Sequence, residues 1–110
     1  MNKIIIFTFF DDIGGNRLRG QITPEISELS KLTNLIIDGN HLTGTLTTEI
    51  GTLQHLDEIN LANNSLSGEI PSEIGKLVNL TKLEVHYNSF SGTIPAEFEK
   101  LSNLGKHGFF

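Results

Sequence analysis

A 24-residue period runs through most of this 110-residue chain and limits the folds open to it. Three polar columns share that spacing: Asn16, Asn40, Asn64 and Asn88; Gly20, Gly44, Gly68 and Gly92; and Glu25, Glu49, Glu73 and Glu97. Independent columns with one period indicate stacked copies of one structural unit. A single unit cannot bury its own apolar face, so neighbouring units must share a continuous core.

Apolar residues keep the same register in the full units that begin at residues 32, 56 and 80. The same positions are apolar in every one of these units: Leu32, Leu35, Ile37, Leu42, Leu46, Ile50 and Leu53; Leu56, Ile59, Leu61, Leu66, Ile70, Ile74 and Leu77; and Leu80, Leu83, Val85, Phe90, Ile94, Phe98 and Leu101. We predict that these columns form the core.

The first half of each unit has the pattern of a short strand followed by a turn. Ile59 and Leu61 alternate with polar residues, which predicts a strand with one buried face. Asn64 follows, and its amide can bond turn backbone groups that would otherwise be unpaired. Gly68 permits a tight bend. By this register we expect strands centred near residues 35–37, 59–61 and 83–85.

The second half of each unit has the pattern of an extended segment followed by a helical turn. Pro71 lacks the N–H that a central sheet strand needs, so Ile70-Pro71 is expected to be extended. Ile74 and Leu77 are three residues apart, as in one turn of helix or 3₁₀-helix.

The stretch Leu56-x-x-Ile59-x-Leu61-x-x-Asn64-x-Leu66-x-Gly68-x-Ile70-Pro71 resembles the plant-type leucine-rich repeat pattern at every position. The next unit matches with Val85 and Phe90 as apolar variants, while Thr47 replaces the expected proline in the unit before. The resemblance covers residues 13–104. It implies an α/β repeat solenoid: a right-handed stack with a concave parallel β-sheet and short 3₁₀ or helical turns on the convex side. It also implies a second, smaller sheet near the glycine column.

The ends of the chain are irregular. We expect a strand-like segment at residues 1–12, repeats at 13–104 in units starting near 8, 32, 56 and 80, and a truncated last repeat at 105–110. The apolar N-terminal run is interpreted as a strand covering the first repeat. A clipped signal peptide and a segment unrelated to the fold are alternatives. The missing polar caps predict that the chain is continuous with further repeats in a longer protein.

Composition and motifs argue against several function classes. The net charge of −5 disfavours general nucleic-acid binding. No apolar run approaches the roughly 20 residues of a spanning helix, so no membrane insertion is expected here. There is no cysteine and no catalytic motif, which predicts a non-enzyme without a cofactor. The histidines take different repeat positions and do not predict a metal site: His41, His55, His86 and His107.

The glutamate column could be a vertical row of carboxylates that binds cations. The competing interpretation is a solvated convex face, and we favour it. Each glutamate begins a helical turn, where negative charge suits the dipole. Lys76 and Lys100 follow Glu73 and Glu97 by three residues, as expected for ion pairs on a helix surface.

The surface best suited to a partner is the concave face of the strands. Its non-apolar positions are Asn34, Ile36 and Asp38; Glu58, Asn60, Ala62 and Asn63; and Lys82, Glu84, His86 and Tyr87. We predict that a protein or peptide partner contacts Asp38, Glu58, Asn60, Lys82, Glu84, His86 and Tyr87. Asp38 and Glu84 would favour a basic peptide, and Lys82 would pair with a carboxylate. The alternative is that these are ordinary exposed residues.

By resemblance, the chain is expected to be a non-catalytic binding module of a larger receptor-like or secreted recognition protein. The alternatives are a piece of a receptor kinase ectodomain and an inhibitor of secreted enzymes. By the same resemblance, the protein is expected to be extracellular or a membrane-anchored ectodomain. Two N-glycosylation acceptors, Asn63 in Asn63-Asn64-Ser65 and Asn79 in Asn79-Leu80-Thr81, fit that expectation, although so short a motif is a weak signal.

Overall fold

The computed structural model describes residues 10–12, as backbone only, and residues 18–105. Its strands are β1 (Phe10–Asp12), β2 (Arg19–Gly20), β3 (Asn34–Ile36), β4 (His41–Leu42), β5 (Glu58–Asn60), β6 (Ser67–Glu69), β7 (Lys82–Glu84) and β8 (Ser89–Ser91). Its 3₁₀-helices are η1 (Pro24–Glu28), η2 (Thr48–Thr52), η3 (Ser72–Lys76) and η4 (Ala96–Lys100). The expectations for residues 1–9, 13–17 and 106–110 lie outside the described residues.

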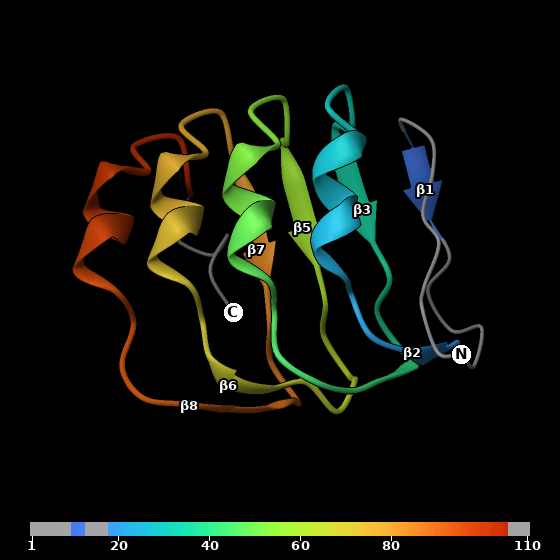
Figure 1. Ribbon diagram of the computed structural model, residues 1–110. Helices are drawn as coiled ribbons and strands as arrows, with labels where there is room; N and C mark the ends of the chain where they lie inside the picture. The colour runs from blue at the N-terminus through green and yellow to red at the C-terminus, as the bar shows by residue number, and fades with distance from the viewer. Residues whose placement is uncertain (1–9, 13–17, 106–110) are drawn as a thin grey trace.

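A four-stranded parallel sheet, in the order β1-β3-β5-β7, forms one side of the stack (Figure 1). Leu35 pairs with Ile59 and Ile59 pairs with Leu83, so the register equals the sequence period. These strands are centred on Leu35, Ile59 and Leu83, within the predicted ranges. The ladder extends beyond them, because the N–H of Ile37 donates to the carbonyl of Asn60 at 3.0 Å.

The 3₁₀-helices form the opposite layer (Figure 1). They can pack closely because two glycines lie between consecutive turns. A Cβ on Gly51 would lie 2.7 Å from the Glu73 carbonyl oxygen, and one on Gly75 would lie 2.7 Å from that of Glu97. Either distance is a clash, so the backbone spacing requires glycine at both positions. Gly51 and Gly75 are also 24 residues apart in the sequence, but they were not among the predicted columns.

Thr47, which departs from the repeat pattern, has a structural role of its own. It is the N-cap of η2, and its Oγ1 accepts a hydrogen bond from the N–H of Glu49 at 3.2 Å. Threonine is a favoured N-cap residue for this reason. Pro71 and Pro95 take the same place before η3 and η4 without a side-chain hydrogen bond.

Short strands near the glycine column form the second sheet that the resemblance implied, in two separate pairs. β2 pairs with β4 and β6 pairs with β8, and a bridge from Thr45 to Ser67 lies between the pairs. Gly68 shows why this column is glycine. Its φ is +78°, and an added Cβ would lie 2.9 Å from Cγ2 of Thr45 in the preceding repeat.

The asparagine column ties each repeat to its neighbour. Nδ2 of Asn64 donates to the carbonyls of Leu61 and Ile37, both at 3.1 Å. Its Oδ1 accepts from the N–H of Leu42 at 3.0 Å. Asn88 repeats the arrangement, donating to the carbonyl of Leu61 at 2.8 Å and accepting from Leu66 at 2.9 Å. The predicted role of these amides in satisfying turn backbone is confirmed.

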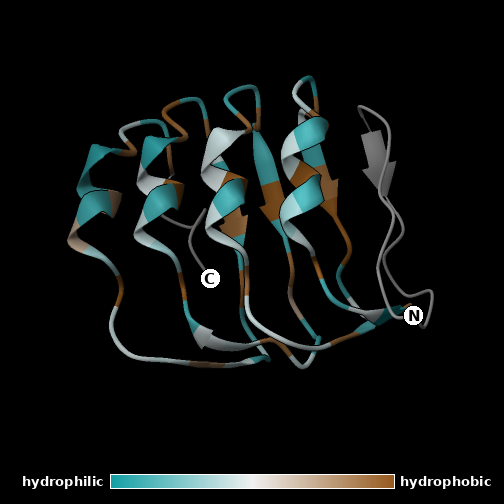
Figure 2. Ribbon diagram, viewed as in Figure 1, coloured by the Kyte–Doolittle hydropathy of each residue, from teal (hydrophilic) through white to brown (hydrophobic). Residues whose placement is uncertain are grey.

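Apolar side chains pack into one core between the two layers. In Figure 2, hydrophobic residues (brown) recur at equivalent places along the stack, most clearly on β3, β5 and β7. Almost all of the predicted core positions are buried. Ile70 and Phe90 are only partly buried, and Ile94 is 46% exposed, so the expectation is wrong for Ile94. The equivalent Leu46 is 4% exposed. Within the described residues no further repeat packs over Ile94, which accounts for the difference.

Candidate binding face

The outer side of the four-stranded sheet, the expected concave face, carries polar and charged side chains. We call this surface the sheet face: Asn34, Ile36, Asp38, Glu58, Asn60, Lys82, Glu84 and His86, with Asn63 and Tyr87 at its rim. Strand alternation places these residues opposite the buried ones. Ala62 was expected here but is 2% exposed, so it belongs to the interior.

Three charged residues form a compact cluster on β5 and β7. Nζ of Lys82 lies 3.2 Å from Oε2 of Glu84 and 3.8 Å from Oε2 of Glu58. The pKa of Lys82 is raised above its ordinary value because Glu84 accepts a hydrogen bond from the ammonium group and both carboxylates attract its charge. Lys82 therefore already has its counter-charges, which argues against the expected pairing with a ligand carboxylate.

Two aromatic rings lie next to this cluster. His86 and Tyr87 meet edge to face, with ring centroids 5.1 Å apart and an interplanar angle of 75°. Tyr87 is 75% exposed, whereas His86 is half-buried. Among the described residues, Nδ1 of His86 has no hydrogen-bond partner although it is buried. This end of the sheet face thus combines an exposed ring, a polar nitrogen and a net negative cluster.

Tyr87 has an unusual backbone conformation. Gly39, Asn63 and Tyr87 occupy one column of the repeat, and their φ values are 69°, 59° and 56°. Glycine adopts this left-handed region freely and asparagine tolerates it, whereas a bulky side chain there is strained. The glycine and the asparagine that precede Tyr87 in this column are a sequence signal for a left-handed backbone, and no prediction was based on it.

The remaining predicted residues are more widely spread. Asp38 on one repeat and Asn60 on the next are half-buried at the sheet face. Oδ1 of Asn60 accepts from the N–H of Ala62 at 3.1 Å, so part of its hydrogen-bonding capacity is already used. The structure therefore concentrates the distinctive chemistry at β5 and β7 and leaves Asp38 apart from it.

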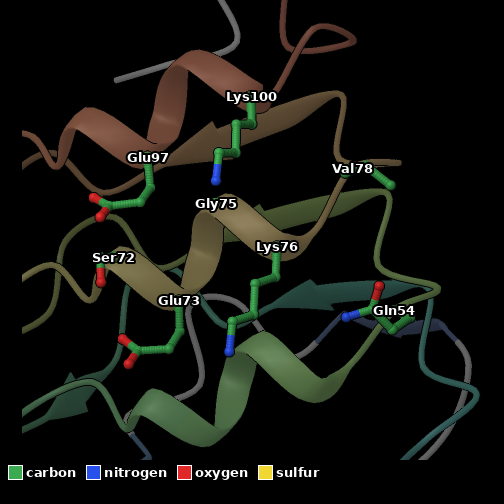
Figure 3. A pocket seen from close by; sticks show the side chains of 8 residues that line it. All are labelled: Gln54, Ser72, Glu73, Gly75, Lys76, Val78, Glu97 and Lys100. Atoms are coloured by element: carbon green, nitrogen blue, oxygen red, sulfur yellow. The ribbon is translucent and has the colours of Figure 1, made fainter.

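The convex layer contains a groove of about 460 Å³ between η3 and η4. Glu73 and Glu97 both point to the left in Figure 3, and Lys76 and Lys100 both extend down the view. Glu73 with Lys76 and Glu97 with Lys100 form no ion pair in the described structure, so the expected pairs between these glutamates and lysines are absent. Glu73 is half-buried because its stem covers Gly51, so the glutamate column is only partly solvated.

Neither a metal site nor a membrane span is found in the described part of the chain. No group of three or more histidine, aspartate or glutamate side chains is placed to hold an ion there. Residues 10–12 and 18–105 also contain no helix that is long and apolar enough to span a bilayer. His107, one of the four histidines, lies outside the described residues.

Comparison with known proteins agrees with the geometry. The leucine-rich repeat family matches residues 30–90 of the chain. The chain belongs to the leucine-rich repeat family. No curated protein matches it in sequence.

Solved leucine-rich repeat structures share its fold. The ectodomain of the Arabidopsis thaliana receptor kinase GASSHO1/SCHENGEN3, in complex with CASPARIAN STRIP INTEGRITY FACTOR 2, is 33% identical with a TM-score of 0.82. That match covers 94% of this chain and 12% of the ectodomain chain. The Arabidopsis HAESA ectodomain, bound to an IDA peptide hormone, is 36% identical with a TM-score of 0.74, over 76% of this chain and 14% of the other.

A third similar structure is the BIR3–SERK2 complex of Arabidopsis thaliana, at 37% identity and a TM-score of 0.76, covering 89% of this chain and 51% of that one. The chain thus spans a small part to about half of these structures. It is a leucine-rich repeat module that resembles receptor kinase ectodomains, a fold that is typically non-catalytic.

Proposed function

We propose that the chain is a non-catalytic protein- or peptide-binding segment of a receptor-like ectodomain, and that its partner contacts the sheet face around Lys82, Glu84, His86 and Tyr87. The observation that carries the proposal is the conformation of Tyr87. A 75% exposed tyrosine stands where the fold prefers glycine or asparagine. Strained residues of this kind cluster at functional sites. The similar HAESA ectodomain in complex with a peptide hormone and the similar BIR3–SERK2 complex support the same function.

The charges favour a basic ligand. Glu58 and Glu84 share one lysine, so the cluster carries a net charge of −1 at neutral pH. A ligand cation near Glu84 would meet uncompensated negative charge, with Asp38 adding more two repeats away. Tyr87 can contribute a broad contact at small entropic cost and can face a cation through its ring.

The described sheet face is too small to form a full interface. Four strands span three gaps of about 4.8 Å, or roughly 14 Å. A five-residue strand stretch adds roughly 16 Å, which gives on the order of 230 Å² of projected surface. A standard interface needs about 800 Å² per partner. We therefore propose that this segment provides part of a site completed by further repeats of an extracellular or membrane-anchored protein.

The test is a peptide-display selection against the purified chain, using random libraries rich in lysine and arginine. Selected peptides are then titrated against Y87A, E84Q and the convex control E73Q. We expect Y87A to weaken binding by about tenfold or more, as truncation of an aromatic hot spot does. E84Q should weaken binding mainly at low ionic strength. If E73Q weakens binding and the sheet-face variants do not, the wrong surface has been chosen.

A further inference from the structure

Asn63 and Tyr87 lie side by side at the rim of the sheet face. They occupy the same column in neighbouring repeats and share a left-handed backbone, with φ values of 59° and 56°. The N–H of Asn63 donates to the carbonyl of His86 at 3.0 Å, and that of Asn64 donates to the carbonyl of Tyr87 at 3.2 Å. The two backbones are therefore about 4.8 Å apart, and their side chains leave in the same direction.

The two glycosylation acceptors differ in what the fold does with them. Asn63 is exposed, and its side chain makes no hydrogen bond within the described residues. In the other motif, Nδ2 of Asn79 donates to the carbonyl of Gln54 at 3.3 Å, and Oγ1 of Thr81 donates to Oδ1 of Asp57 at 2.7 Å. A sugar on Asn63 would interrupt no contact of the folded chain, whereas one on Asn79 would compete with an inter-repeat hydrogen bond.

We propose that Asn63 carries an N-linked glycan that shields Tyr87 and so controls access to the sheet face. The inference rests on the extracellular location in the proposed function. In the reaction, Nδ2 of Asn63 attacks the anomeric carbon of a polyprenyl-diphosphate-linked oligosaccharide. A C–N bond forms and Nδ2 loses one proton. The C–O bond to the diphosphate breaks, and its electron pair leaves with the polyprenyl diphosphate.

The glycan would act on Tyr87 through bulk. N-linked sugars are large, hydrated and mobile at the surface. One strand spacing separates the attachment point from the tyrosine, and both side chains project from the same rim. A protein-sized partner approaching Tyr87 would therefore meet the sugar first, while small solutes would still reach the ring.

The chain offers a direct readout, because it has one tyrosine and no tryptophan. Tyrosine emission therefore reports on Tyr87 alone. The full chain would be secreted from a eukaryotic host behind a cleaved leader, with occupancy of Asn63 and Asn79 measured by mass spectrometry. Access to Tyr87 would be measured with acrylamide as a small quencher, and by peroxidase-catalysed iodination as a protein-sized probe.

Two variants separate the acceptors. S65A removes the first motif while keeping Asn63, and the exposed Ser65 side chain makes no hydrogen bond in the described structure. N79Q removes the second acceptor. We expect S65A to increase the iodination rate of Tyr87 severalfold and to increase acrylamide quenching of its emission by a smaller factor. N79Q should leave the iodination rate and the quenching unchanged. Circular dichroism checks that S65A keeps its fold.

Two results would overturn the proposal. One is an unmodified Asn63 in the secreted chain; the other is an occupied Asn63 with the same iodination rate as S65A. Neither readout involves a ligand, so either failure would leave the proposed binding function to its own test with Y87A.

Discussion

The core columns and the sheet face belong to the same strands but follow opposite rules. Leu35, Ile59 and Leu83 are apolar, fully buried and paired in register across three strands. On the opposite side, Asn34, Glu58 and Lys82 share an equally regular register and differ in charge from one repeat to the next. The buried side of each strand is regular and determines how the repeats stack on one another. The exposed side varies from repeat to repeat, so each repeat offers different side chains to a partner.

The difference follows from what each side touches. A core side chain meets the same neighbours in every repeat, so any departure leaves a cavity or a clash. A sheet-face side chain meets solvent and one or two neighbours, so the fold tolerates almost any residue there. Substitutions in the two regions should therefore differ widely in their effect on the free energy of unfolding.

Removing a core leucine should have the largest effect. Leu61 is fully buried. We expect L61A to lower the free energy of unfolding by about 2–5 kcal/mol, from lost apolar burial and the cavity left behind. Urea unfolding followed by circular dichroism measures the change, with N60A on the sheet face as the matched control. A loss below about 1 kcal/mol would contradict the core assignment of Leu61.

The asparagine column should rank second. N64A leaves the N–H of Leu42 without its partner in a half-buried site. It also removes one of the two donors to the carbonyl of Ile37, which keeps the hydrogen bond from Nδ2 of Asn40. Each buried polar group left unpaired costs about 1–3 kcal/mol. We expect a loss in that range by urea unfolding, and almost none for S65A, one residue away on the surface. If N64A and S65A lowered the free energy of unfolding by a similar small amount, water would be replacing the hydrogen bonds of the Asn64 amide.

A glycine substitution tests the backbone of the turn. Gly68 has a φ of +78°, and an added Cβ would lie 2.9 Å from Thr45. We expect G68A to cost about 1–2 kcal/mol, the penalty of a left-handed alanine. Nothing lies within 4 Å of a Cβ placed on Gly105, so G105A is the control and should stay within about 0.5 kcal/mol of the parent. Comparable losses in both would refute the backbone argument.

The sequence predicted the regular features well, because the periodic columns determine them directly. The parallel sheet, the 3₁₀ turns and the asparagine hydrogen bonds all follow from residues that recur. The repeat pattern predicted burial wrongly where the exposure of a side chain depends on its surroundings in the stack. Ile94 is exposed because no described repeat covers it, and Ala62 is buried although it alternates like a surface residue. The Lys82 cluster depended on rotamers that no period specifies.

The smallest effect should have the opposite sign, and it bears most directly on function. Y87N replaces a strained tyrosine with the residue found at the equivalent Asn63. A left-handed backbone costs a bulky residue about 1–2 kcal/mol, and asparagine keeps a part of this cost, so the substitution relieves only the remainder. The lost ring contact with His86 costs about 0.5 kcal/mol at so exposed a site. Strain relief should win, so Y87N is expected to raise the free energy of unfolding by less than about 1 kcal/mol.

N63Y is the reciprocal variant and should lower the free energy of unfolding by a similar amount. Urea unfolding of both variants by circular dichroism decides the matter. A clear loss of stability in Y87N would mean that Tyr87 serves the fold, and the argument for Tyr87 as a binding residue would fail.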